Sequence, residues 1–191
     1  MPEAVIIGVG NILLKDEGVG IYAAKYIDEN FLFSPSIDII DGGTIGYRLI
    51  NYLQGYDKVF ILDTISADDE PGSIYSMPSE ALMGMGHYRR TAHEVEVVEM
   101  LEICSLTETM AEVNVIGIVP EDIKNVGIDL TDKLKNHFDA FVGTAINELK
   151  KAGFKARRKR NKRSLDAIIQ AYNLPHAQRP SARREVSEQL I

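Results

Sequence analysis

Short runs of apolar, mostly β-branched residues alternate along this chain with stretches in which apolar residues recur every three or four positions. The first pattern is typical of buried strands, and the second is typical of helices that cover a sheet. Strands are expected at residues 4–9, 37–40, 58–62 and 113–119, and helices at 18–27, 45–56, 91–104 and 134–149. This alternation predicts an α/β fold, a three-layer α/β/α sandwich whose mostly parallel central sheet has about five strands.

Short local motifs indicate one further strand and the start of one helix. Residues 73–77 follow a polar, turn-rich loop at 66–72 and form the candidate for an antiparallel edge strand. Thr91-Ala92-His93-Glu94 has the S/T-x-x-E spacing of a capping box, so the third helix is expected to begin at Thr91.

Charge divides the chain near residue 154. Residues 1–154 hold 11 Lys and Arg against 25 Asp and Glu, a charge of −14, whereas residues 155–191 hold 10 against 3, a charge of +7. A chain of 191 residues suits one sizeable core. We therefore predict a single α/β domain at 1–154 and a basic C-terminal extension at 155–191. Because basic residues crowd into 155–163, a flexible extension is favoured over docking onto the acidic body, a second copy or an acidic partner.

Composition argues against several classes of protein. No apolar run is long enough to cross a bilayer, so membrane insertion is not expected. The N-terminus lacks the basic flank and cleavage site of a secretory signal, and the single cysteine, Cys104, excludes an internal disulfide, so a cytoplasmic location is expected. An acidic body repels phosphate, which makes nucleic acid an unsuitable partner.

The turn after the first strand combines glycines with carboxylates. Gly8-Val9-Gly10 begins a G-x-G-x-x-G fingerprint, but Leu13 stands where the third glycine belongs. Asp16 and Glu17 lie just before the expected helix, where a pyrophosphate would need amide donors rather than negative charge. Two carboxylates at this place suit a metal cation, or else they cap the helix and complement its dipole.

Two further residues are expected near the same edge of the sheet. Asp63 ends a buried strand, and the carboxyl ends of parallel strands face the binding crevice; alternatively, Asp63 only accepts hydrogen bonds from loop amides. His93 falls in the first turn of its helix, where a core histidine is the plainer interpretation. Together Glu17, Asp63 and His93 supply two oxygen ligands and one imidazole, a set typical of a functional divalent-metal site.

Other catalytic arrangements lack support. The stretch from His93 to Val97 misses the second histidine of H-E-x-x-H, so a zincin site is not supported. Cys104 lies on the apolar stripe of its helix and is interpreted as core rather than as a nucleophile. A serine triad has no support, because the sequence contains no G-x-S-x-G.

Five short segments, in this order and at these separations, resemble the hydrogenase maturation protease family. They are Gly8-Val9-Gly10-Asn11, Asp16-Glu17-Gly18-Val19-Gly20, Asp41-Gly42-Gly43-Thr44-Ile45-Gly46, Asp63 and His93. The resemblance covers about residues 4–150, and the family's metal-binding residues fall on Glu17, Asp63 and His93.

The resemblance implies a metal-assisted, aspartic-type endopeptidase that removes the C-terminal extension of a nickel-iron hydrogenase large-subunit precursor after nickel insertion. Nickel would be supplied by the precursor, and Glu17, Asp63 and His93 would recognise it. The catalytic candidates are these three residues and Asp16, with the proton-transfer group left open among the carboxylates. The glycine loop at 41–46 either shapes a peptide groove or is a strand-to-helix turn that needs positive φ.

Two other functions stay open at this stage. A non-catalytic nickel-sensing metallochaperone or assembly platform for the same precursor would use the same three ligands. A nucleotide-binding α/β domain is disfavoured by the incomplete glycine fingerprint and by the two carboxylates beside it.

Overall fold

A computed structural model describes residues 3–44, 46–84, 92–106 and 110–174, apart from the side chains of Tyr47, Ala92, His93, Glu94 and Glu96. Its larger sheet has five strands in the order β3-β1-β4-β6-β5. They are β1 (Ala4–Val9), β3 (Asp38–Gly43), β4 (Lys58–Thr64), β5 (Ile74–Pro78) and β6 (Glu112–Ile118). Four strands are parallel, and β5 pairs antiparallel with β6 at one edge, as the sequence predicts.

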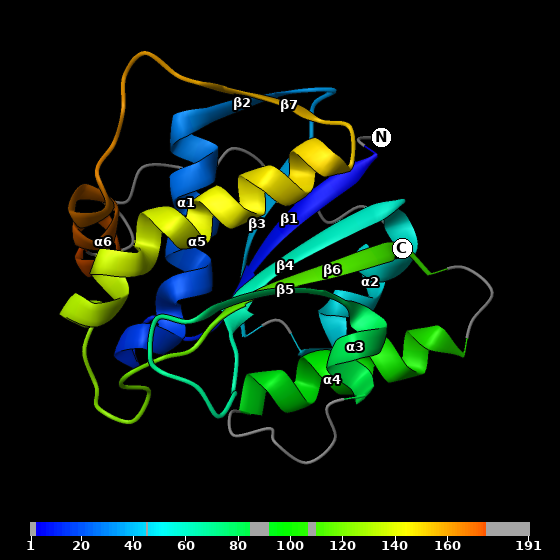
Figure 1. The fold of residues 1–191 in the computed structure, drawn as a ribbon, viewed down its shortest axis with the longest axis horizontal. Helices are drawn as coiled ribbons and strands as arrows, with labels where there is room; N and C mark the ends of the chain where they lie inside the picture. The colour runs from blue at the N-terminus through cyan, green and yellow to red at the C-terminus, as the bar shows by residue number, and fades with distance from the viewer. Residues whose placement is uncertain (1–2, 45, 85–91, 107–109, 175–191) are drawn as a thin grey trace.

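Helices cover both faces of this sheet and complete the predicted three-layer α/β/α sandwich (Figure 1). One face carries α1 (Val19–Asn30), α5 (Asp132–Lys151) and α6 (Leu165–Asn173), and the other carries α2 (Leu49–Gly55), α3 (Ser79–Gly84) and α4 (Ala92–Ser105). Two 3-10 turns, η1 (Lys15–Gly18) and η2 (Gly46–Arg48), lead into α1 and α2. Successive strand residues alternate between the two apolar cores: Ile6 belongs to the core beneath α1, and Ile7 to the core beneath α4.

The structure contains elements that the sequence patterns do not predict. The strands β2 (Phe31–Ser34) and β7 (Lys155–Arg158) form a separate antiparallel pair. The helix α3 is too short for a periodic pattern to reveal. The predicted start of α4 at Thr91 lies outside the described residues, and so do the side chains of its capping box. No helix in the described ranges is long and apolar enough to span a membrane.

The extension predicted to be flexible docks onto the body along residues 155–174. β7 pairs with β2, and α6 buries Ile168 and Ile169 in the core beneath α1. Between these elements, the buried side chain of Asn30 accepts a hydrogen bond from the Arg163 amide at 2.7 Å and donates one to the Arg163 carbonyl at 3.0 Å. The Arg163 guanidinium also lies 3.3 Å from the Glu29 carboxylate. Polar and acidic groups at the end of α1 therefore bind this segment, although the repulsion between its basic side chains favours disorder.

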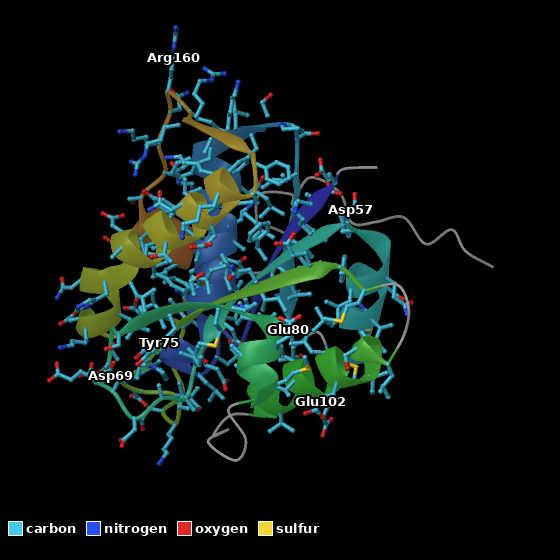
Figure 2. The ribbon with its side chains drawn as sticks, turned by 45° about the vertical axis from the view of Figure 1, so that its right-hand side comes forward. Asp57, Asp69, Tyr75, Glu80, Glu102 and Arg160 are labelled. Atoms are coloured by element: carbon cyan, nitrogen blue, oxygen red, sulfur yellow. The ribbon has the colours of Figure 1, made fainter. Side chains whose placement is uncertain are left out.

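The other basic side chains of the extension lie mainly on the surface. Five of them are exposed, namely Lys155, Arg157, Arg158, Arg160 and Lys162. Figure 2 shows Arg160 projecting from the end of the molecule where β7 lies. Asn30, the last residue of α1, accepts a hydrogen bond through its carbonyl from the Lys159 amide. Because α1 runs back along β1, this basic end lies at the amino ends of the strands, away from Asp63 (Figure 1).

The backbone of helix α1 lies in direct contact with the backbone of the sheet. A Cβ atom added to Gly20 would lie 2.1 Å from the Leu62 carbonyl oxygen and 2.4 Å from that of Val9. These distances are far inside van der Waals contact, so only glycine lets the helix lie so close to the ends of β1 and β4. The close approach sets η1, which carries Glu17, against β4, which carries Asp63.

We expect Gly20→Ala to lower the free energy of unfolding by about 2–3 kcal/mol, because the added methyl group forces α1 away from two backbone carbonyls. Gly143→Ala in α5 is the matched control, since nothing lies within 4 Å of a Cβ atom added there. Alanine should raise the free energy of unfolding at that helical position by about 0.5–1 kcal/mol. Urea unfolding of both variants measures the two changes, and an unchanged stability of Gly20→Ala would contradict this packing.

Candidate active site

Asp63 lies at the carboxyl end of β4, with only 3% of its surface exposed. Val59 and Ile61 of the same strand belong to the core beneath α2 and α4. Side chains alternate along a strand, so Asp63 faces that layer too. Its Oδ1 atom accepts a hydrogen bond from the Thr64 amide at 2.7 Å, which orients the carboxylate. Asp63 thus occupies the strand end predicted for it and points toward the layer that contains α4.

Glu17 belongs to η1 and is 5% exposed. Its carbonyl accepts a hydrogen bond from the Asn11 amide at 3.1 Å, which folds the chain after β1 back on itself. Gly10 stands at the centre of this turn with a φ of 140°, and a Cβ atom there would lie 1.8 Å from the Glu17 carbonyl oxygen. A glycine is therefore required at position 10 if Glu17 is to keep its place.

Asp16 is fully buried and holds together two distant parts of the chain. Its carboxylate accepts hydrogen bonds from the amides of Glu121, Asp122 and Thr131, at 3.0, 2.9 and 2.7 Å, and from the Thr131 hydroxyl at 3.0 Å. Thr131 is the N-cap of α5, where its hydroxyl oxygen accepts a hydrogen bond from the Leu134 amide. Asp16 thus places its negative charge at a helix N-terminus, which is the structural role predicted for it, but the helix is α5 rather than α1.

The segment before Glu17 is fixed by further contacts with the loop between β6 and α5. Leu14 and Gly127 form a parallel bridge, and the Lys15 amide donates to the Gly127 carbonyl at 3.0 Å. Lys15 adopts a φ of 47°, a conformation that a side chain disfavours and that surrounding contacts must hold in place. This loop carries no sequence pattern that marks it as part of a site, and the prediction missed it for that reason.

An ion pair joins the same two segments. Lys15 Nζ donates a hydrogen bond to Asp122 Oδ2 at 2.6 Å. This bond, supported by the side chain and amide of Asn125, holds the pKa of Asp122 well below its usual value. The same bond raises the pKa of Lys15. Both groups are therefore charged at neutral pH, and their attraction favours the strained backbone of Lys15.

His93 is the second residue of α4, in the first turn as predicted, but its side chain lies outside the described part of the structure. The helix runs back along β6, so its first turn lies toward the carboxyl ends of the strands (Figure 1). Among the side chains that are described, no three His, Cys, Asp or Glu residues gather closely enough to hold a metal ion. The set of Glu17, Asp63 and His93 therefore stays a prediction.

Cys104 is fully buried in the core beneath α4, where the sequence places it. Burial raises the pKa of its thiol, so the thiolate needed for nucleophilic attack is disfavoured. The glycine segment at 41–46 leads from the end of β3 into η2, and Gly43 and Gly46 have the predicted positive φ, at 51° and 47°. Its groove-shaping alternative stays a prediction.

The chain is similar to proteins of hydrogenase maturation. The model of the hydrogenase maturation protease family matches residues 21–148. The chain is 25% identical to the hydrogenase 2 maturation protease of Escherichia coli K12 over 153 residues, which are 79% of this chain and 93% of that protein. It is 28% identical to the hydrogenase expression/formation protein HoxM of Cupriavidus necator over 151 residues, 78% of this chain and 75% of HoxM.

Two solved structures share the fold. The hydrogenase maturating endopeptidase HybD of E. coli superposes with a TM-score of 0.76 at 23% identity, covering 83% of this chain and 98% of HybD. The [NiFe] hydrogenase maturation protease HybD of Thermococcus kodakarensis superposes with a TM-score of 0.62 at 28% identity, covering 78% of this chain and 99% of that protein.

The chain therefore belongs to the hydrogenase maturation protease family. It is a hydrolase that processes a hydrogenase precursor. Asp63 and His93 lie within the range that the family model matches, and Asp16 and Glu17 lie just before it.

Replacing Asp16 by alanine is expected to lower the free energy of unfolding by about 3 kcal/mol or more, because three backbone amides and one hydroxyl lose a charged acceptor that is fully buried. Glu112→Gln is the control: its pair with Lys58 lies at the amino ends of the strands and Glu112 is largely exposed, so the change should stay within about 1 kcal/mol. Urea unfolding compares the two. Equal losses in both variants would show that Asp16 is not the anchor described here.

Proposed function

We propose that this protein is an endopeptidase that removes the C-terminal extension of a nickel-iron hydrogenase large-subunit precursor after nickel has been inserted. One observation carries the proposal within the family. Glu17 and Asp63 come from separate elements, are both almost fully buried, and lie at the edge where η1 contacts β4. His93 lies in the first turn of α4, the helix in the layer that Asp63 faces.

The chemistry of these groups suits a divalent cation. Two buried carboxylates at one edge of a sheet repel each other, and a cation between them would relieve that repulsion. Carboxylate oxygens and an imidazole nitrogen are ligands that first-row divalent metals accept. We propose that Glu17, Asp63 and His93 bind the nickel that the precursor carries, so that nickel belongs to the substrate and is not stored by the protease.

Nickel bound to both partners would polarise the scissile carbonyl and lower the pKa of a water molecule. The chain itself would orient the peptide and supply a carboxylate that accepts the proton of the attacking water. Asp16 is poorly suited to that task, because both of its oxygens already accept hydrogen bonds from the loop between β6 and α5. We therefore give Asp16 the role of an anchor and keep Glu17 and Asp63 as candidates for proton transfer. Processing is proposed to take place in the cytoplasm.

Each of Glu17→Gln, Asp63→Asn and His93→Gln is expected to slow cleavage about 100-fold or more, because each removes one of three metal ligands. Glu99→Gln, which changes an exposed carboxylate on the same helix as His93, should cleave like the wild type. The measurement is the mass of the large subunit after incubation with nickel-loaded precursor. Wild-type rates in all three ligand variants would show that the site has been assigned wrongly.

Nickel-free precursor is expected to stay at full length under the same conditions, because it brings no metal to the three ligands. Cleavage of nickel-free precursor at the full rate would remove nickel recognition from the mechanism. Binding of nickel-loaded precursor without any loss of mass would instead support the metallochaperone or assembly platform.

A further inference from the structure

The end of α6 reaches the end of β3 and the loop between β6 and α5, which flank the segment carrying Glu17. The Tyr172 hydroxyl donates a hydrogen bond to Asp41 Oδ2 at 2.9 Å, near the carboxyl end of β3. The neighbouring Asn173 donates from its side-chain amide to the Ile128 carbonyl at 3.3 Å, in the loop between β6 and α5. Two successive residues of the extension thus contact a strand end and a loop that are far apart in the sequence.

The strand end and the loop are each in turn bonded to the segment from Gly10 to Glu17. On one side, Asp41 Oδ1 accepts a hydrogen bond from the Gly43 amide at 3.1 Å, and the Gly43 carbonyl accepts one from the Gly10 amide at 3.0 Å. On the other side, Gly127, next to Ile128, exchanges hydrogen bonds with the backbone of Leu13 and Lys15. The Glu17 segment therefore lies between the end of β3 and the loop between β6 and α5, both of which α6 contacts.

The helix that makes these contacts is itself well fixed. Ile168 and Ile169 are buried in the core beneath α1, and Ser164 caps the helix by accepting a hydrogen bond from the Ala167 amide at 3.2 Å. The ring of Tyr172 packs edge-on against that of Tyr22 in α1, with centroids 5.5 Å apart and an interplanar angle of 75°. Tyr22 is fully buried, so the ring contact defines where the Tyr172 hydroxyl lies.

We propose that α6 is a positioning element for the processing site, in which Tyr172 and Asn173 hold the Asp41–Gly43 end of β3 and the loop at Ile128 in the arrangement that binds the precursor. The inference rests on the function proposed above. Helix α6 lies beyond residue 148, where the match to the family model ends. Loops that are already ordered bind a peptide with less loss of conformational entropy, so the effect falls mainly on substrate binding.

The test uses the full-length chain with Tyr172→Phe, which keeps the ring contact with Tyr22 and removes only the hydroxyl. Loss of one hydrogen bond to a carboxylate is expected to raise KM for nickel-loaded precursor about 3- to 10-fold while kcat changes less than about 2-fold. Tyr56→Phe is the matched control. The Tyr56 hydroxyl donates a hydrogen bond to Asp38 Oδ2 at 2.8 Å, at the amino end of β3, the strand that also contains Asp41. An unchanged KM in Tyr172→Phe, or an equal rise in both variants, overturns the proposal.

A second measurement does not depend on cleavage. Amide hydrogen exchange, followed by mass spectrometry on peptides that include Gly10 and Gly43, should be about 3- to 10-fold faster in Tyr172→Phe and unchanged in Tyr56→Phe. If the wild type fails to cleave the precursor, the proposed function is wrong. The exchange rates still decide whether α6 holds the end of β3 in place. Equal exchange in Tyr172→Phe and the wild type means that it does not.

Discussion

The carboxylate of Asp16 connects the two halves of the site region. It is fully buried, and it accepts hydrogen bonds from the loop between β6 and α5 and from the residue that caps α5. The strained backbone at Lys15, the bridge between Leu14 and Gly127 and the ion pair to Asp122 all lie within this same contact. The place of Glu17, one residue further on, depends on this anchor. A buried charge with four donors around it is costly to move, and this gives the turn its rigidity.

A second constraint acts from the sheet. Gly20 lets α1 lie against the carbonyls of Val9 and Leu62, so the helix that follows Glu17 starts at the edge where β4 ends. Glu17 is thus fixed from both directions along the chain, by Asp16 before it and by the packing of α1 after it. Asp63 comes from the sheet itself and His93 from the opposite helical layer. The proposed metal ligands therefore come from three independent elements of the sandwich.

The first part of the extension, residues 155–174, packs against the α/β domain as part of it. Its basic charge suggests a segment that repels itself, yet Asn30 and Glu29 at the end of α1 bind Arg163, and two isoleucines of α6 join the core. The chain then returns from the amino ends of the strands to the carboxyl ends, where Tyr172 meets Asp41. A domain boundary drawn from charge alone falls at residue 154, one residue before a strand that pairs with β2.

The sequence by itself determined the layers, the parallel sheet with its antiparallel edge, the buried place of Cys104 and the family. These features follow from periodicity and short ordered motifs, which are local properties of the chain. The candidate residues Asp16, Glu17, Asp63 and His93 could also be found there, because strand ends and helix starts can be recognised locally. Only the tertiary structure decided that Asp16 accepts hydrogen bonds at the start of α5, that residues 121–131 support the site and that α6 bridges the end of β3 and the loop between β6 and α5. Each of these depends on contacts between residues about 45 to 131 positions apart, and no local pattern in the sequence encodes which distant amide or hydroxyl a carboxylate will meet.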